Sequence, residues 1–139
     1  MSRIMKHLKY ILFFIILCSF GMTPVKAQVN TDQVLRIGQN SLYLEDYVLS
    51  IQYFNQVIAA KPYLAQPYFF RAIAKLSLDD YRGAEEDASM AIQKNPFITN
   101  AYEVRGVARQ NLGRHREAIA DYEKALEQLP ENRGILFNK

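Results

Sequence analysis

Three prolines, Pro62, Pro96 and Pro130, follow one another at intervals of 34 residues. Proline cannot continue a helix, so this equal spacing predicts a structural unit that ends at the same point each time. Counting back from each proline gives three aligned units: 31–64, 65–98 and 99–132. Such units stack on their neighbours rather than folding around one irregular core.

The aligned units also share apolar or small residues, which we number by their place within the unit. In the first half they occupy places 4, 8 and 14: Val34, Tyr68 and Tyr102; Gly38, Ala72 and Gly106; Leu44, Leu78 and Leu112. In the second half they occupy places 20, 24 and 27: Ser50, Ala84 and Ala118; Phe54, Ala88 and Tyr122; Val57, Ala91 and Ala125. Both sets have helical spacing, which predicts two packed helices per unit and an all-α fold.

The small residues at places 8 and 20 predict a close helix crossing, with Gly106 facing Ala118 in the third unit. Between the two sets lie acidic or glycine-containing pairs, which predict the turn inside each unit: Glu45-Asp46, Asp79-Asp80 and Gly113-Arg114. A helical hairpin of this size cannot bury both faces alone, so the three hairpins are expected to form a solenoid.

The N-terminus has the layout of a secretory signal peptide. A basic segment, MSRIMKHLKY, precedes the apolar run ILFFIILCSFGM, and Val25 and Ala27 are small residues placed for cleavage before Gln28. We therefore expect residues 1–27 to be a signal peptide and the protein to be exported, to the periplasm or cell envelope of a bacterium. The alternative is an uncleaved anchor, although twelve apolar residues fall short of the roughly twenty that span a bilayer.

Cys18 is the only cysteine, and Leu17 before it disfavours a lipoprotein signal. Removal of residues 1–27 leaves no cysteine for disulfides or thiolate metal sites. It also leaves thirteen Lys and Arg against fourteen Asp and Glu in residues 28–139, a net charge of −1. This balance disfavours nucleic acid as a partner, and a membrane partner is expected only through an uncleaved signal segment.

The run of matching places in the third unit, Tyr102, Gly106, Ala118, Tyr122, Ala125 and Pro130, resembles a tetratricopeptide repeat (TPR). The other two units follow the same pattern, so the resemblance covers everything after the signal. It implies a right-handed superhelical solenoid of three TPR units. Lys75 and Arg109 depart from the pattern, because the family has a large apolar residue at place 11.

The resemblance also implies a concave groove lined by the first helix of each unit, at places 2, 5, 9, 12 and 13. Those places hold Asp32, Leu35, Gln39, Leu42 and Tyr43; Gln66, Phe69, Ile73, Leu76 and Ser77; and Asn100, Glu103, Val107, Gln110 and Asn111. Family members that capture a C-terminal carboxylate use lysine, arginine and asparagine here, and this groove has no lysine or arginine. We expect an apolar peptide segment or partner helix as ligand. Alternatively, Phe69 and Ile73 pack against the chain's own continuation after Pro130.

At two further places, 7 and 23, the residue types of the three units change together. Place 7 holds Ile37, Arg71 and Arg105, and place 23 holds Tyr53, Asp87 and Asp121. The apolar residue accompanies the aromatic one, and each arginine accompanies an aspartate. These columns predict the ion pairs Arg71–Asp87 and Arg105–Asp121, within a unit or between neighbours; independent solvation of the four side chains is the alternative.

The sequence offers little for catalysis. His115, between Arg114 and Arg116, occupies place 17, where the other units have Tyr47 and Tyr81, so we interpret it as structural. The acids between residues 79 and 87 lack the alternating ligands of a calcium loop. With no phosphate loop or nucleophile motif, we expect no enzyme activity, no cofactor and no metal.

We therefore expect a protein–protein interaction scaffold in the cell envelope. Two other readings stay open: the N-terminal capping part of a longer TPR array without its own ligand, or an accessory domain of a larger enzyme. Residues 133–139 are expected to begin a further helix.

Overall fold

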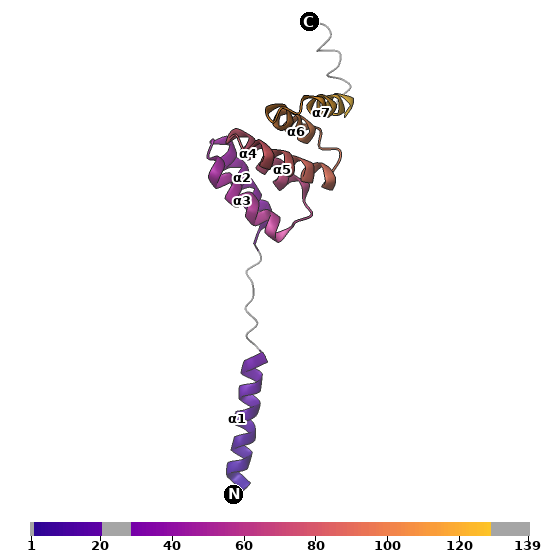
Figure 1. Ribbon diagram of the computed structural model, residues 1–139. Helices are drawn as coiled ribbons and strands as arrows, with labels where there is room; N and C mark the ends of the chain where they lie inside the picture. The colour runs from indigo at the N-terminus through magenta and orange to yellow at the C-terminus, as the bar shows by residue number, and fades with distance from the viewer. Residues whose placement is uncertain (1, 21–28, 129–139) are drawn as a thin grey trace.

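The computed structural model describes residues 2–20 and 29–128, and these residues are helical with no strand among them. Seven helices follow one another along the chain (Figure 1): α1 (Ser2–Phe20), α2 (Thr31–Tyr43), α3 (Tyr47–Ala60), α4 (Ala65–Ser77), α5 (Tyr81–Lys94), α6 (Thr99–Asn111) and α7 (His115–Gln128). The predicted all-α fold is confirmed.

Helices α2 to α7 form three hairpins, α2–α3, α4–α5 and α6–α7, stacked in chain order (Figure 1). The first helix of each hairpin contacts the first helix of the next, so that α2, α4 and α6 make an inner layer. In the part of the chain that the structure describes, α3, α5 and α7 do not contact one another and form the outer layer. The predicted groove residues all belong to this inner layer, on α2, α4 and α6.

The turn inside each hairpin has the same backbone structure. A residue with positive φ ends the first helix: Glu45 (62°), Asp79 (60°) and Gly113 (77°). Its N–H donates to the carbonyl three residues back, and the next N–H donates to the carbonyl five residues back. These two hydrogen bonds form the Schellman motif, which satisfies backbone carbonyls at the helix end. In the first two turns the next residue, Asp46 or Asp80, also caps the following helix with its carboxylate.

The turn corrects one prediction about packing. Place 14 was expected on the buried face of the first helix, yet Leu44 is 75% exposed and Leu78 is 45% exposed, whereas Leu112 is half-buried. The helix ends one residue earlier, and Leu44 and Leu78 are its C-cap residues. Beyond the last helical residue the side chain no longer follows the helical face, so spacing alone misplaced Leu44 and Leu78.

The close crossing inside the first and third hairpins joins a glycine to an aromatic ring. A Cβ at Gly38 would lie 2.7 Å from the Phe54 ring, and one at Gly106 would lie 2.6 Å from the Tyr122 ring. The three atoms nearest to such a Cβ at Gly106 all belong to Tyr122. Ala118, which the sequence predicted to face Gly106, is not among these three contacts. Because place 24 carries a ring in these hairpins, the ring fills the space above the glycine. The second hairpin has the buried Ala72 and Ala88 at these places.

The core runs between the two layers and joins the hairpins. Phe54 of α3 is fully buried and stacks on Phe70 of α4, with ring centroids 5.8 Å apart. Further along, Tyr68 packs with the buried Ala91 and Ala101, and half-buried apolar side chains surround this cluster. Small residues on α5 and α6 let the second and third hairpins approach closely.

Helix α1 lies apart from the other six helices in Figure 1. No helix in the described part of the chain is long and apolar enough to cross a membrane. The expected cleavage site at Val25, Ala27 and Gln28 lies outside the described residues, as do Pro130 and residues 133–139.

Candidate functional site

The inner surface of α2, α4 and α6 presents the predicted groove residues. Six of them, all from α2 and α4, are half-buried: Leu35, Gln39, Leu42, Phe69, Ile73 and Leu76. Five others are exposed: Tyr43, Asn100, Glu103, Val107 and Gln110. The side chains on α2 and α4 thus make a largely apolar surface, and those on α6 make a mostly polar one.

Phe69 serves the core as well as the surface. Its ring lies against Phe70, with centroids 5.2 Å apart, and it packs on the cluster of Tyr68, Ala91 and Ala101. Part of the Phe69 ring is therefore covered by α4, α5 and α6, whereas the alternative, packing against the continuation after Pro130, lies outside the described residues. The accessible remainder is held rigidly in place, which favours a contact surface because little side-chain entropy is lost on binding.

The α6 part of the groove is polar and internally bonded. The Tyr122 hydroxyl donates to Gln110 Oε1 at 2.9 Å, and the Asn111 amide donates to the carbonyl of Val107. Burial raises the pKa of Tyr122, and the negative charges of Asp121 and Glu103 raise it further. Tyr122 therefore stays a neutral donor at physiological pH, and Gln110 is already engaged.

The two ion pairs within hairpins are formed in the structure. Arg71 Nε and Nη2 donate to the two carboxylate oxygens of Asp87, each at 2.7 Å. Arg105 Nη2 donates to Asp121 Oδ1 at 2.7 Å, and its Nε contacts both oxygens. Both aspartates are buried. Each guanidinium also lies over the tyrosine at place 4 of its own unit, 5.6 Å from the ring centroid.

Each buried aspartate has a second cationic partner that the sequence analysis missed. Lys75 Nζ lies 2.8 Å from Asp87, and Arg109 Nη1 lies 2.9 Å from Asp121. These are the place 11 residues that depart from the family pattern. A signal was present, because place 11 lies one helical turn after place 7 and is basic only in the units with an arginine there.

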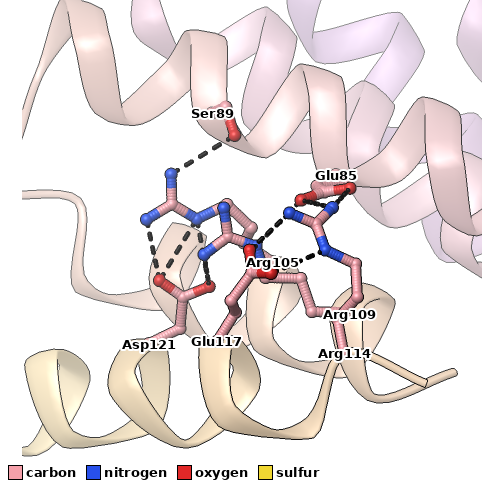
Figure 2. A network of polar contacts seen from close by, with 7 residues as sticks. All are labelled: Glu85, Ser89, Arg105, Arg109, Arg114, Glu117 and Asp121. Atoms are coloured by element: carbon pink, nitrogen blue, oxygen red, sulfur yellow. Dashed lines mark hydrogen bonds and ion pairs between the residues drawn. The ribbon is translucent and has the colours of Figure 1, made fainter. Parts of the chain in front are cut away.

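Charged side chains also connect the second hairpin to the third (Figure 2). Arg105 Nη1 donates to Ser89 Oγ at 3.2 Å, and Arg109 Nε donates to Glu85 at 2.8 Å. Arg114 binds Glu85 of α5 and also Glu117 of its own hairpin. Six charged residues and a serine thus join α5 to α6 and to the turn before α7.

The first and second hairpins have only one counterpart to this network, between Arg71 Nη1 and Asn55 Oδ1 at 2.7 Å. Place 21, which is Glu85 in the second unit, is Ile51 in the first. Aromatic packing of Phe54 on Phe70 replaces the charged contacts.

At the surface of the network the charges shift pKa values in the expected directions. The hydrogen bond from Arg114 lowers the pKa of Glu117, and the same bond raises the pKa of Arg114. Glu117 is therefore ionised at neutral pH.

His115 begins α7, as Tyr47 and Tyr81 begin α3 and α5, and it is exposed. The Tyr81 hydroxyl donates to Asp79 at 2.8 Å, and this bond is the main cause of a raised Tyr81 pKa. The place 17 column thus lies where the turn meets the second helix.

Comparison with known proteins identifies one matching family and many solved structures with a similar fold. A family model described as tetratricopeptide repeat matches residues 99–132. The first TPR of Spaghetti (RPAP3), bound to the HSP90 peptide SRMEEVD, aligns with a TM-score of 0.72 and 30% identity, covering 76% of this chain and 83% of that one. No curated protein sequence matches the chain.

Two further structures are similar. The second TPR of Spaghetti (RPAP3), bound to the same peptide, has a TM-score of 0.70 and 29% identity, covering 73% of this chain and 94% of that one. The first TPR domain of human RPAP3 has a TM-score of 0.70 and 31% identity, covering 73% and 80% respectively.

Proposed function

Because the chain belongs to the tetratricopeptide repeat family, we propose that it is an exported scaffold for protein–protein interaction. Its ligand is an apolar peptide segment or partner helix, bound on the inner surface of α2 and α4. The similar Spaghetti domains are solved with a peptide bound, which supports a peptide as ligand.

The charge of the inner surface is the observation that carries the proposal. Its fifteen groove places hold no lysine or arginine, and their only charged residues are Asp32 and Glu103. A peptide such as SRMEEVD, with two glutamates, an aspartate and a terminal carboxylate, would meet acids without a compensating cation. The half-buried Leu35, Leu42 and Ile73 favour an apolar ligand instead.

Export is the second part of the proposal. The basic segment, the short apolar run and the residues before Gln28 support removal of residues 1–27. Mass spectrometry of the envelope fraction should find a mature N-terminus at Gln28. Intact Met1 in a membrane-bound form would instead establish a retained anchor.

The ligand class is tested by selecting binders from a random peptide library on the purified chain. We expect the selected peptides to be rich in apolar residues and to keep their affinity at high salt, because no cation lines the groove. Tyr43→Ala removes an exposed groove ring without opening the core and should weaken binding several-fold. Phe69→Ala should weaken it more, with circular dichroism to show that the helices persist.

Val48→Ala is the matched control, because Val48 is an exposed apolar residue on the outer helix α3. It should leave peptide affinity unchanged. Binding that disappears at high salt while surviving Phe69→Ala and Tyr43→Ala would refute the apolar groove.

A further inference from the structure

The loops that enter the three hairpins carry exposed apolar side chains at one repeated place. Val29, Tyr63 and Phe97 are separated by 34 residues each, and each precedes the first helix of its hairpin by two residues. They are 52%, 66% and 82% exposed. Because the hairpins are antiparallel, these loops all lie at the edge of the solenoid opposite the turns inside the hairpins. We call residues 29–30, 61–64 and 95–98 the loop edge.

The two complete loops are built so that the ring points outward. Each is a turn closed by a backbone hydrogen bond, from Leu64 to Lys61 and from Ile98 to Asn95, both at 3.3 Å. Proline follows the first residue of each turn, where its fixed φ suits the turn. Leu64 and Ile98 are half-buried, and Ile98 packs against the core cluster. The turn therefore anchors one apolar side chain and leaves Tyr63 or Phe97 in solvent.

Charge separates the loop edge from the opposite edge. The loop edge contains Lys61 and no acid. Lys94 ends α5 just before it, and Asp32 lies two residues after it in the first turn of α2. The turns at residues 44–46, 78–80 and 112–114 contain four acids and a single base, Arg114. Val29 and Lys61 line the same hollow, together with Asp32, so the first two segments of the loop edge (29–30 and 61–64) are neighbours. A negatively charged surface would attract the loop edge and repel the turns.

We propose that the loop edge binds the surface of an anionic lipid bilayer, with Tyr63 and Phe97 inserted at the headgroup level. Aromatic rings beside lysines are the side chains that favour this interface, where the ring leaves water and the ammonium meets lipid phosphate. An additional protein would also accept exposed rings, but Lys61 in this edge and Lys94 beside it favour an anionic lipid surface. The proposal is independent of the peptide groove, which occupies the inner surface.

The experiment uses the absence of tryptophan from the chain. Phe97→Trp in the full chain places a single fluorophore on the loop edge, and Tyr43→Trp places one at an exposed site beside the opposite turns. With vesicles of phosphatidylcholine and phosphatidylglycerol, we expect Trp emission at position 97 to move to shorter wavelength and to be quenched by brominated lipid. Emission at position 43 should not change.

Helix α1 is identical in both variants, so its own binding to vesicles does not affect the comparison. Lys61→Gln added to the Phe97→Trp variant should reduce the shift, and vesicles of phosphatidylcholine alone should give a weaker one. An unchanged emission at position 97 would overturn the proposal and leave a protein as the partner of this edge. Equal shifts at positions 97 and 43 would also overturn it.

Discussion

The joint between the first and second hairpins and the joint between the second and third hairpins rest on different interactions. Phe54 stacks on Phe70 where α3 meets α4, and two neutral acceptors add polar contacts: Asn55 binds Arg71, and the Pro62 carbonyl accepts from the Tyr68 hydroxyl. Where α5 meets α6, Glu85 binds Arg109 and Arg114 across the joint (Figure 2). The same division appears on the inner surface, which is apolar on α2 and α4 and polar on α6.

This difference shows that one repeat pattern accommodates two kinds of joint. Stacked rings gain free energy by leaving water and tolerate small changes in angle. Bidentate arginine–carboxylate contacts add little net stability, but they require a particular geometry. We infer that the charged joint fixes the orientation of the third hairpin, while the apolar joint supplies more of the burial.

The largest expected effect is the loss of a buried charge in the third hairpin. Asp121→Asn leaves Arg105 and Arg109 without their shared carboxylate, and breaking a buried pair in this way costs about 3 kcal/mol. Urea unfolding of the variant should show this loss. Asp32→Asn, which changes an exposed acid, should stay within about 0.5 kcal/mol of the parent. A loss below about 1 kcal/mol for Asp121→Asn would mean that the network is solvated and not structural.

The next effect compares the two glycine–ring contacts. Gly38→Ala and Gly106→Ala place a methyl group 2.7 Å from Phe54 and 2.6 Å from Tyr122. Phe54 is fully buried, whereas Tyr122 is partly exposed and able to swing outward. Because overpacking costs about 1–3 kcal/mol, we expect about 2 kcal/mol for Gly38→Ala and less than about 1 kcal/mol for Gly106→Ala. Thermal unfolding of both variants tests the order, and the reverse order would contradict the assigned difference in ring mobility.

A smaller effect concerns the positive-φ residue of the turns. A Cβ at Gly113 would contact nothing, so Gly113→Ala costs only the left-handed backbone strain of about 1 kcal/mol. Glu45→Gly relieves the same strain in the first hairpin and should stabilise it by up to about 1 kcal/mol. Asp79→Gly should gain less, because it also removes the acceptor of the Tyr81 hydroxyl. Chemical denaturation should find Glu45→Gly the most stable of the three variants, Asp79→Gly next and Gly113→Ala the least stable.

The smallest effect is the pH dependence of the exposed end of the charged joint. The pKa of Glu117 is lowered in the folded protein by Arg114, so the unfolded chain binds the proton more readily. The stability that this pair contributes is therefore present above the unfolded pKa and is lost as pH falls through the folded value. Glu117→Gln should be slightly less stable than the parent at neutral pH, and the difference should vanish in acid. A constant difference across pH would exclude this ionisation as its cause.

The sequence predicted the helical hairpins because proline spacing and apolar periodicity are local properties. The columns at places 7 and 23 also revealed Arg71, Asp87, Arg105 and Asp121, since opposite charges that change together indicate contact. The sequence did not lead to the contacts that Lys75 and Arg109 make with the same aspartates. These two residues were compared with a family pattern instead of with their neighbours one helical turn away. Pairing between hairpins, as from Glu85 to Arg114, depends on how the units stack, and no repeat column encodes it.

The inner surface was predictable in its residues but not in its accessibility. Phe69 reads as a groove residue by place, and only the structure shows that part of its ring is packed against Phe70. Gln110 is likewise committed to the Tyr122 hydroxyl. Contacts of this kind depend on neighbouring units and rotamers, which one sequence does not specify.

The central claim is that the inner surface of α2 and α4 binds apolar peptides and rejects acidic ones. Isothermal titration calorimetry with a library-selected peptide and with SRMEEVD tests it in one comparison. The account predicts salt-independent binding of the selected peptide, weakened by Phe69→Ala and Tyr43→Ala, and no binding of SRMEEVD. Tight binding of SRMEEVD that is lost at high salt, with no effect of either substitution, would contradict it.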